Sequence, residues 1–294
     1  MLISLLHRAL CFRYRMLGGI TRVTSIRGLP VHYVEFQNCP APVLFFVHGL
    51  GTSSSSWVNL FPHFKDHYHI VALDLPGFGL SPPPSHKPFL TIPEFDSLLR
   101  EFVDAVLPEQ FILIGHSLGG WLSMRLSAQL PERVSHLILM NTAGIFHQGV
   151  EEQKQLFTFS RMGDVRTLLT RMWYNYPWYF KPFLPAIYND LQKRRVSEFV
   201  ATIQEEDFVN DSLENLSMPV SLIWGKDDRL LSWQSVEILR TKLPHLRLRT
   251  IAHCGHVPQL EQPAMLKKIL EEVLSEDDKR GFHTAASPAG RLLT

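Results

Sequence analysis

A serine stands at the centre of the pentapeptide Gly115-His116-Ser117-Leu118-Gly119. A serine hydroxyl is a weak nucleophile unless the fold exposes it beside a base. A sharp turn from a strand into a helix does this, and it needs positions without side chains two residues before and after the serine. Gly115 and Gly119 meet that need, and the helix N-terminus would direct the Leu118 N–H at a developing oxyanion. The pentapeptide therefore predicts a nucleophilic serine, with a plain glycine-rich turn as the alternative.

A nucleophilic serine needs a general base and an acid that orients the base, and candidates for both follow later in the chain. Asp227 and Asp228 stand in IWGKDDRLL, at the end of an apolar run. His256 stands in IAHCGHVPQLEQP, after the last such run. Because sites in open parallel sheets collect at the carboxyl ends of the strands, we expect one of these aspartates to meet His256 and Ser117 there.

A second oxyanion donor is predicted in FFVHGLGTSSSSW, where His48 and Gly49 end an apolar run. The Leu50 N–H would join the Leu118 N–H in holding the oxyanion, and the missing side chain of Gly49 would let the backbone approach a substrate. We therefore expect Leu50 and Leu118 to form the oxyanion hole, and His48, Gly49 and His116 to border the substrate. A glycine turn followed by a serine-rich helix cap is the plainer interpretation.

Short apolar runs alternate with helical patterns along most of the chain, which predicts a mostly parallel sheet with right-handed crossovers. The first two runs, in VTSIRGLPVHYVEF, surround a turn and predict a hairpin. Later strands are predicted in APVLFFVHG, HIVALDLPG, FILIG, RVSHLILMN, PVSLIWG and LRLRTIA. Helices are predicted at residues 92–106, from the serine to about residue 130, and at about residues 232–243 and 260–274.

Strand patterns are missing between residues 145 and 215, which look helical throughout. We therefore expect one α/β core, residues 21–144 and 216–275, interrupted by a helical insertion after its sixth strand. Residues 1–20 form a basic amphipathic segment of their own. Residues 276–294 are polar and rich in small side chains, and we expect a disordered tail there.

Five motifs in this order resemble the α/β-hydrolase superfamily, in its serine esterase and lipase branch with a helical cap. They are the pair His48-Gly49, a D-x-P-G-x-G-x-S loop at residues 74–81, the turn around Ser117, a G-x-x-D turn at residues 225–228 and a G-H-x-P turn at residues 255–258. The resemblance covers about residues 23 to 274. It implies a mostly parallel sheet with helices on both faces and a cap at residues 145–215. It also implies that Asp228, the fourth residue of its turn, is the acid instead of Asp227.

The superfamily hosts many reactions, so the fold does not determine the substrate. Its haloalkane dehalogenases and epoxide hydrolases carry an aspartate where Ser117 stands, which disfavours both. Its carbon–carbon hydrolases usually carry an aromatic residue after the histidine, where this chain has Val257. We therefore expect a carboxylesterase, or a lipase on small or single-chain esters such as monoacylglycerols. A carbon–carbon hydrolase of ring-cleavage products, an acyltransferase and a non-catalytic ligand-binding member are the alternatives.

The predicted cap contains eight aromatic residues between positions 171 and 188. Such residues either pack among themselves or form an apolar acyl tunnel or a lipid-facing surface. The second interpretation favours a lipid-like ester as the substrate.

The total charge is near zero, which argues against nucleic acid as a partner. Residues 1–34, however, carry five arginines and no acid. Its first part, the basic amphipathic residues 1–20, is interpreted as a solvated helix, a helix on an anionic membrane surface, or a transit peptide. The three cysteines are widely spaced, which predicts neither disulfides nor a zinc site and favours a reducing, cytoplasmic compartment. We expect no cofactor and no metal, and the sequence leaves the oligomeric state open.

Overall fold

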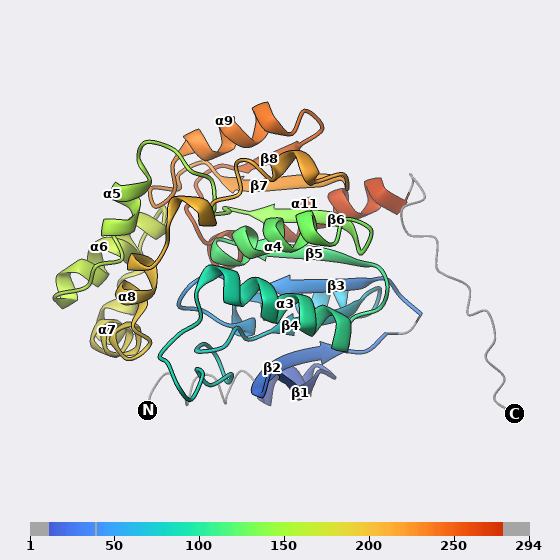
Figure 1. Ribbon diagram of the computed structural model, residues 1–294, viewed down its shortest axis with the longest axis horizontal. Helices are drawn as coiled ribbons and strands as arrows, with labels where there is room; N and C mark the ends of the chain where they lie inside the picture. The colour runs from blue at the N-terminus through green and yellow to red at the C-terminus, as the bar shows by residue number, and fades with distance from the viewer. Residues whose placement is uncertain (1–11, 39, 279–294) are drawn as a thin grey trace, which may run out of the picture.

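The computed structural model describes residues 12–38 and 40–278. They form an eight-stranded sheet in the order β1-β2-β4-β3-β5-β6-β7-β8 (Figure 1). The strands are β1 (Ile20–Ile26), β2 (Leu29–Phe36), β3 (Val43–Val47), β4 (His69–Leu73), β5 (Phe111–His116), β6 (Val134–Met140), β7 (Val220–Gly225) and β8 (Arg247–Ile251). β2 pairs antiparallel with β1 and β4, and all other neighbours are parallel. The predicted α/β-hydrolase fold, with its mostly parallel sheet, is confirmed.

Helices connect the strands and form the insertion. In the core they are η1 (Ser54–Trp57), α2 (Phe61–Phe64), α3 (Ile92–Val106), α4 (Leu118–Gln129), α9 (Trp233–Lys242), α10 (Pro258–Glu261) and α11 (Pro263–Asp278). Between β6 and β7 they are α5 (Val150–Gln155), α6 (Met162–Met172), η2 (Trp178–Phe183), α7 (Leu184–Lys193), α8 (Val196–Ala201), η3 (Glu205–Asp207) and η4 (Leu213–Asn215). The helical insertion after the sixth strand is therefore present, and we call residues 145–215 the cap.

The two faces of the sheet bury alternate side chains of the same strands, because successive residues of a strand point to opposite sides. On β3, Phe45 packs with α3, α4 and α9 on one face. Leu44 and Phe46 pack with η1, α2 and α11 on the other. Helices thus cover both faces, as the resemblance implies. In Figure 1 the cap lies at the left, beyond the ends to which the parallel strands point.

The described part of the N-terminal segment is attached to the core. Residues 12–16 are helical, and Tyr14 is 1% exposed there. The Tyr14 hydroxyl donates to the Ser54 carbonyl at 3.1 Å, and its ring lies 5.5 Å from that of Phe61. Phe12 and Met16, on the same short helix, are 66% and 73% exposed. Residues 1–11 of the predicted segment lie outside the described residues.

The end of the core lies further along the chain than its predicted boundary at residue 275. α11 continues to Asp278, because its apolar residues recur with helical spacing through Leu274 and Glu276 pairs with Arg249 of β8 at 2.8 Å. Residues 279–294 of the predicted tail lie outside the described residues. Within the described part of the chain, no helix is long and apolar enough to cross a bilayer.

Candidate active site

Ser117 lies at the sharp turn between β5 and α4, with a backbone φ of 54° and ψ of −119°. A positive φ is strained for a residue with a side chain, and such strain persists only where the surroundings impose it. A Cβ on Gly115 would lie 2.5 Å from the Gly119 carbonyl oxygen, and one on Gly119 would lie 2.1 Å from that of Val47. Both glycines are therefore required by close backbone approach, as the motif predicts.

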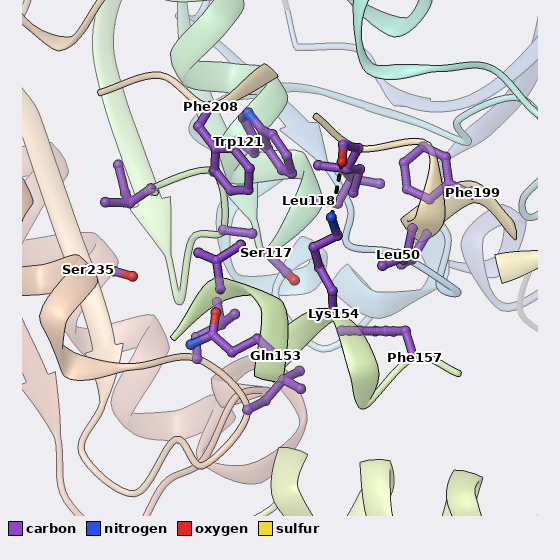
Figure 2. Close-up of a pocket in the computed structure, with 18 residues that line it drawn as sticks. Leu50, Ser117, Leu118, Trp121, Gln153, Lys154, Phe157, Phe199, Phe208 and Ser235 are labelled. Atoms are coloured by element: carbon purple, nitrogen blue, oxygen red, sulfur yellow. Dashed lines mark hydrogen bonds between the residues drawn. The ribbon is translucent and has the colours of Figure 1, made fainter. Parts of the chain in front are cut away.

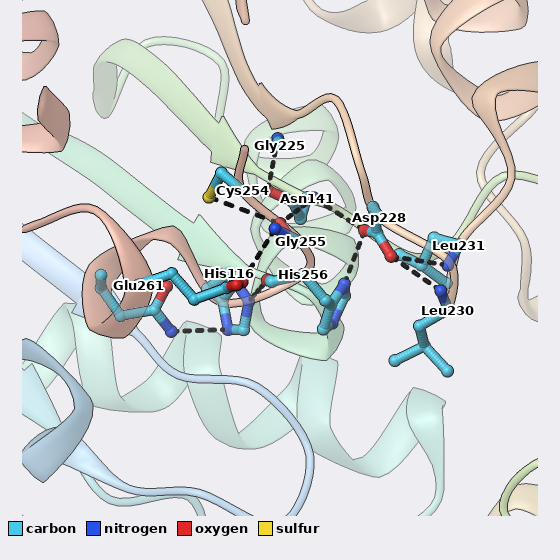
Figure 3. Close-up of polar contacts among 11 residues, drawn as sticks. His116, Asn141, Gly225, Asp228, Leu230, Leu231, Cys254, Gly255, His256 and Glu261 are labelled. Carbon is cyan, nitrogen blue, oxygen red and sulfur yellow. Dashed lines mark hydrogen bonds and ion pairs between the residues drawn. The ribbon is translucent and has the colours of Figure 1, made fainter. Parts of the chain in front are cut away.

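Asp228 and His256 form a buried hydrogen-bonded pair, with 2.8 Å between the Asp228 Oδ2 and His256 Nδ1 atoms. Their side chains are 0% and 2% exposed. The other carboxylate oxygen, Oδ1, accepts the N–H groups of Leu230 and Leu231 at 2.9 and 3.0 Å. Asn141 is the fourth donor to this carboxylate, and Figure 3 shows the network. Because the Asp228 carboxylate only accepts hydrogen bonds, the imidazole of His256 carries its proton on Nδ1, which leaves Nε2 as a base.

The neighbouring aspartate is placed differently. The backbone N–H of Asp227 donates to the Cys254 carbonyl at 2.9 Å. Within the described residues, its carboxylate makes no hydrogen bond to His256. The geometry therefore pairs Asp228 with the histidine, as the resemblance implies.

The imidazole of His256 lies next to the serine turn. Its ring centroid is 5.0 Å from that of His116, the residue that precedes Ser117. No hydrogen bond joins Ser117 to His256 within the described residues. Such bonds often tighten only when a substrate is bound.

Leu50 and Leu118 both line the pocket into which Ser117 opens. Leu118 is the first residue of α4, so its N–H has no acceptor within the helix. Leu50 follows the end of β3, which is the immediate neighbour of β5 in the sheet. The two predicted oxyanion donors thus belong to adjacent strand ends and to one pocket.

His48, Gly49 and His116 do not line this pocket, so their predicted contact with substrate is not supported by the structure. His48 is fully buried, and its Nε2 accepts the Leu75 N–H at 3.0 Å. His116 Nε2 donates to the His256 carbonyl at 2.8 Å. Burial, with the nearby His256 ring, lowers the pKa of His116 to about 3, so this side chain is neutral. Through these bonds His48 holds the loop after β4 and His116 holds the loop of His256.

Asn141 is a site residue that the motifs do not reveal. It follows β6, is fully buried, and donates from Nδ2 to Asp228 Oδ2 at 2.7 Å. Its Oδ1 accepts the Gly225 N–H at 3.2 Å. The sequence signal that could have found it is its position: Asn141 is a polar residue that ends RVSHLILMN, the predicted strand after the serine turn.

The cap is bonded directly to the histidine loop. The His256 N–H donates to the Met172 carbonyl at 2.6 Å. Glu261 accepts the Gly255 N–H at 2.8 Å and the Tyr174 N–H at 2.7 Å. Burial raises the pKa of Glu261, against the opposing effect of these backbone donors. The end of α6 and the histidine loop thus form one hydrogen-bonded unit.

The pocket beside Ser117 is an apolar cavity of about 80 Å³ between the core and the cap (Figure 2). Its aromatic lining comes from Trp121, Phe157, Phe199 and Phe208. The aromatic residues between positions 171 and 188 do not line it, so they form no acyl tunnel here. Several are instead on the surface: Trp178, Tyr179 and Phe183 are 75%, 56% and 44% exposed.

Two other groups bear on the chemistry. Asp74, the first residue of the loop at residues 74–81, accepts the N–H groups of Ser54 and Leu80 at 2.7 and 2.9 Å, and so connects the loops after β3 and β4. Burial raises the pKa of the Cys254 thiol, which makes it a poor nucleophile. Among the described residues, no cluster of three or more His, Cys, Asp or Glu side chains could hold a metal ion.

The sheet, the cap and the buried acid–base pair together define a hydrolase of the α/β type. The model of the alpha/beta hydrolase family matches residues 44–267, and the chain belongs to that family.

Known proteins of several activities are similar to this chain. Lipase 3 of Moraxella sp. is 23% identical over 82% of this chain and 80% of its own length. The crystal structure of a membrane phospholipase A, a bacterial virulence factor, is 25% identical with a TM-score of 0.80, covering 96% of this chain and 93% of that one. A 2-hydroxy-6-oxo-6-phenylhexa-2,4-dienoate hydrolase of Rhodococcus sp. is 21% identical with a TM-score of 0.75, covering 87% and 99%.

Proposed function

We propose that the chain hydrolyses carboxylic esters with apolar acyl groups through an acyl-enzyme on Ser117. The observation that carries this proposal is the position of Ser117, at a strained turn whose side chain opens into an apolar pocket. The buried Asp228–His256 pair supplies the base that a serine nucleophile requires.

In this mechanism His256 Nε2 takes the proton of Ser117 as the hydroxyl oxygen attacks the ester carbonyl. The N–H groups of Leu50 and Leu118 stabilise the oxyanion. The tetrahedral intermediate collapses as His256 gives the proton to the departing alcohol. Water then attacks the acyl-enzyme with His256 again acting as base, and Asp228 holds the imidazole in its tautomer throughout.

Substitution of the nucleophile tests the proposal. Ser117→Ala should lower kcat for p-nitrophenyl esters by a factor on the order of 10⁶ while the melting temperature stays close to that of the unchanged protein. A fluorophosphonate probe should label Ser117 in the unchanged protein. Labelling of another residue, or full turnover by the Ala variant, would refute the assignment. Rates across acyl chain lengths would show which esters fit the pocket.

Hydrolysis of carbon–carbon bonds is the second candidate, favoured by the similarity in fold to the dienoate hydrolase of Rhodococcus. Val257 after the histidine, in place of an aromatic residue, favours esters. The absorbance of a ring-cleavage product reports its hydrolysis. If this product is hydrolysed faster than p-nitrophenyl esters, carbon–carbon bond hydrolysis becomes the first candidate function. An alcohol acceptor that accelerates p-nitrophenol release would reveal acyl transfer.

We also propose that the N-terminal segment contacts anionic membranes. Phe12 and Met16 are exposed on the short helix that Tyr14 attaches to the core, and Arg13 and Arg15 beside them are exposed as well. Apolar and basic side chains on one exposed helix are the combination that binds an anionic lipid surface. A lipid ester substrate, as acted on by the similar lipase and phospholipase, would be found at such a surface.

A further inference from the structure

Lys154 carries the single charge among the described residues that line the pocket of Ser117. The other polar side chains of the lining are Ser117, Gln153 and Ser235, and the remaining residues are apolar. Lys154 belongs to α5 of the cap, whereas Ser117 belongs to the core, so the two sides of the pocket face each other (Figure 2).

The contacts of Lys154 leave its charge available. Its Nζ donates to the Ile203 carbonyl at 3.1 Å and to a Glu151 carboxylate oxygen at 2.9 Å. An ammonium group has three N–H donors, so these two acceptors do not use all of them. The Glu151 side chain is 72% exposed, whereas that of Lys154 is 21% exposed. An ion pair with so exposed a partner is screened by water and is easily exchanged for another anion.

The proposed ester chemistry does not require this charge. Asp228 and His256 supply the acid–base pair, and backbone N–H groups supply the oxyanion donors. A charge held against an apolar wall is costly to desolvate unless a counter-ion meets it. Lys154 lines the pocket among mostly apolar residues, and its ammonium group donates to the carbonyl of Ile203, which is itself a lining residue.

We propose that Lys154 binds an anionic group, a carboxylate or a phosphate, of the substrate. This inference rests on the proposed ester hydrolysis and narrows its substrate class: the preferred ester has an apolar stretch next to the scissile bond and a negative charge beyond it. Lys154 is the residue that selects this ester over its neutral counterpart.

Two matched pairs of esters test the proposal and distinguish the two anions. The first pair is p-nitrophenyl hexanoate and mono-p-nitrophenyl adipate, which differ by a terminal carboxylate on the acyl side. The second is a monoacylglycerol and the corresponding monoacylglycerol phosphate, which differ by a phosphate on the alcohol side. In at least one pair, kcat/KM should be about tenfold or more higher for the anionic ester, as expected for one hydrogen bond to a charged group.

Lys154→Met should abolish this preference, so that kcat/KM falls about tenfold more for the anionic ester than for the neutral one. Lys154→Arg should retain the preference, because it keeps the charge. Lys181→Met is the matched control, since Lys181 is an exposed lysine of η2 that does not line the pocket, and it should change neither rate. Equal losses for both esters in Lys154→Met, or no preference in the unchanged protein for either pair, would overturn the proposal.

A binding measurement keeps this test separate from that of the proposed function. Methyl hexanoate and monomethyl adipate can be titrated calorimetrically into Ser117→Ala, which needs no turnover. The monoacylglycerol and its phosphate can be titrated in the same way. In at least one of the two pairs the anionic ester should bind about tenfold more tightly, and the difference should vanish when Lys154→Met is added. A chain that hydrolyses none of these esters but still shows this difference would refute the ester hydrolysis alone. Equal affinities within both pairs would refute the role of Lys154.

Discussion

Asn141 and His256 donate hydrogen bonds to the same oxygen atom, Asp228 Oδ2, at 2.7 and 2.8 Å. The histidine therefore shares its acceptor with a fixed amide from the end of the neighbouring strand. That amide holds the carboxylate in place and withdraws part of the charge that the imidazole would otherwise receive. If Asp228 orients His256 as proposed, Asn141 acts through Asp228 and is expected to be a positioning residue.

Asn141→Ala should lower kcat/KM about 10- to 100-fold, because a hydrogen bond to a buried carboxylate is lost. Steady-state kinetics and the melting temperature of the variant check this expectation. A rate within twofold of that of the unchanged protein would contradict the positioning role, and a loss of rate that follows only from unfolding would indicate a purely structural role.

Asp228→Asn should lower kcat by about 10⁴, because an amide in place of the carboxylate favours the wrong tautomer of His256. Asp227→Asn is the matched control and should keep most of the activity, since Asp227 makes no bond to the histidine. Steady-state kinetics of the two variants decide between the aspartates. Loss of activity in Asp227→Asn alone would exchange their roles.

His116 makes stability depend on pH. In the unfolded chain it titrates near pH 6.5, whereas in the folded chain its pKa is about 3. Between these values the unfolded state binds a proton that the folded state excludes, so the free energy of unfolding should fall as the pH falls from about 6.5 towards 3. One such proton contributes a slope of up to about 1.4 kcal/mol per pH unit.

His116→Gln should remove this contribution while keeping an N–H donor for the His256 carbonyl. Urea unfolding of both proteins at several pH values between 4 and 7 measures the slopes. The variant should lose less stability on acidification than the unchanged protein. Identical slopes would mean that His116 is protonated in the folded state as readily as in the unfolded chain.

In the N-terminal helix, the residues that attach it to the core differ from those proposed to contact a membrane. Phe12→Ser combined with Met16→Ser should reduce co-sedimentation with anionic vesicles and leave the melting temperature nearly unchanged, because both side chains are exposed. Binding of the unchanged protein should weaken as salt is raised. If the unchanged protein fails to bind anionic vesicles at low salt, the membrane proposal is wrong.

Tyr14→Ala provides the contrasting variant. Its buried ring contacts Phe61 and its hydroxyl bonds to Ser54, so its truncation should cost about 3 kcal/mol of unfolding free energy. Deletion of residues 1–17, a coarser experiment, would therefore destabilise the core as well as remove the exposed residues. Membrane contact and packing on the core are properties of different residues of one helix.

The parts of the structure that local patterns encode were predictable from the sequence. α3 occupies residues 92–106, as its helical pattern predicts, and the serine turn lies between the two glycines that make it. Asp228 and Asp227 could not be separated by pattern alone, because both follow the same strand. Only the spacing shared with the superfamily favoured Asp228.

The remaining site residues depend on contacts between distant parts of the chain. Asn141 meets Asp228 across 87 positions, and no local pattern links them. His48 and His116 stand beside motif residues in sequence, but the fold turns both rings into the core, away from the pocket. Lys154 looks like an ordinary surface lysine of a short helix until the cap places it opposite Ser117.

The bonds from Met172 and Tyr174 to the histidine loop limit how this protein can be re-engineered. A chimaera whose new cap moved the end of α6 would deprive His256 and Glu261 of their backbone partners, and would be expected to lose turnover even with a well-shaped new pocket. Grafts confined to α5 and α8 leave those bonds intact and alter only the walls. Substrate range and catalytic geometry are thus encoded in separable parts of the same insertion.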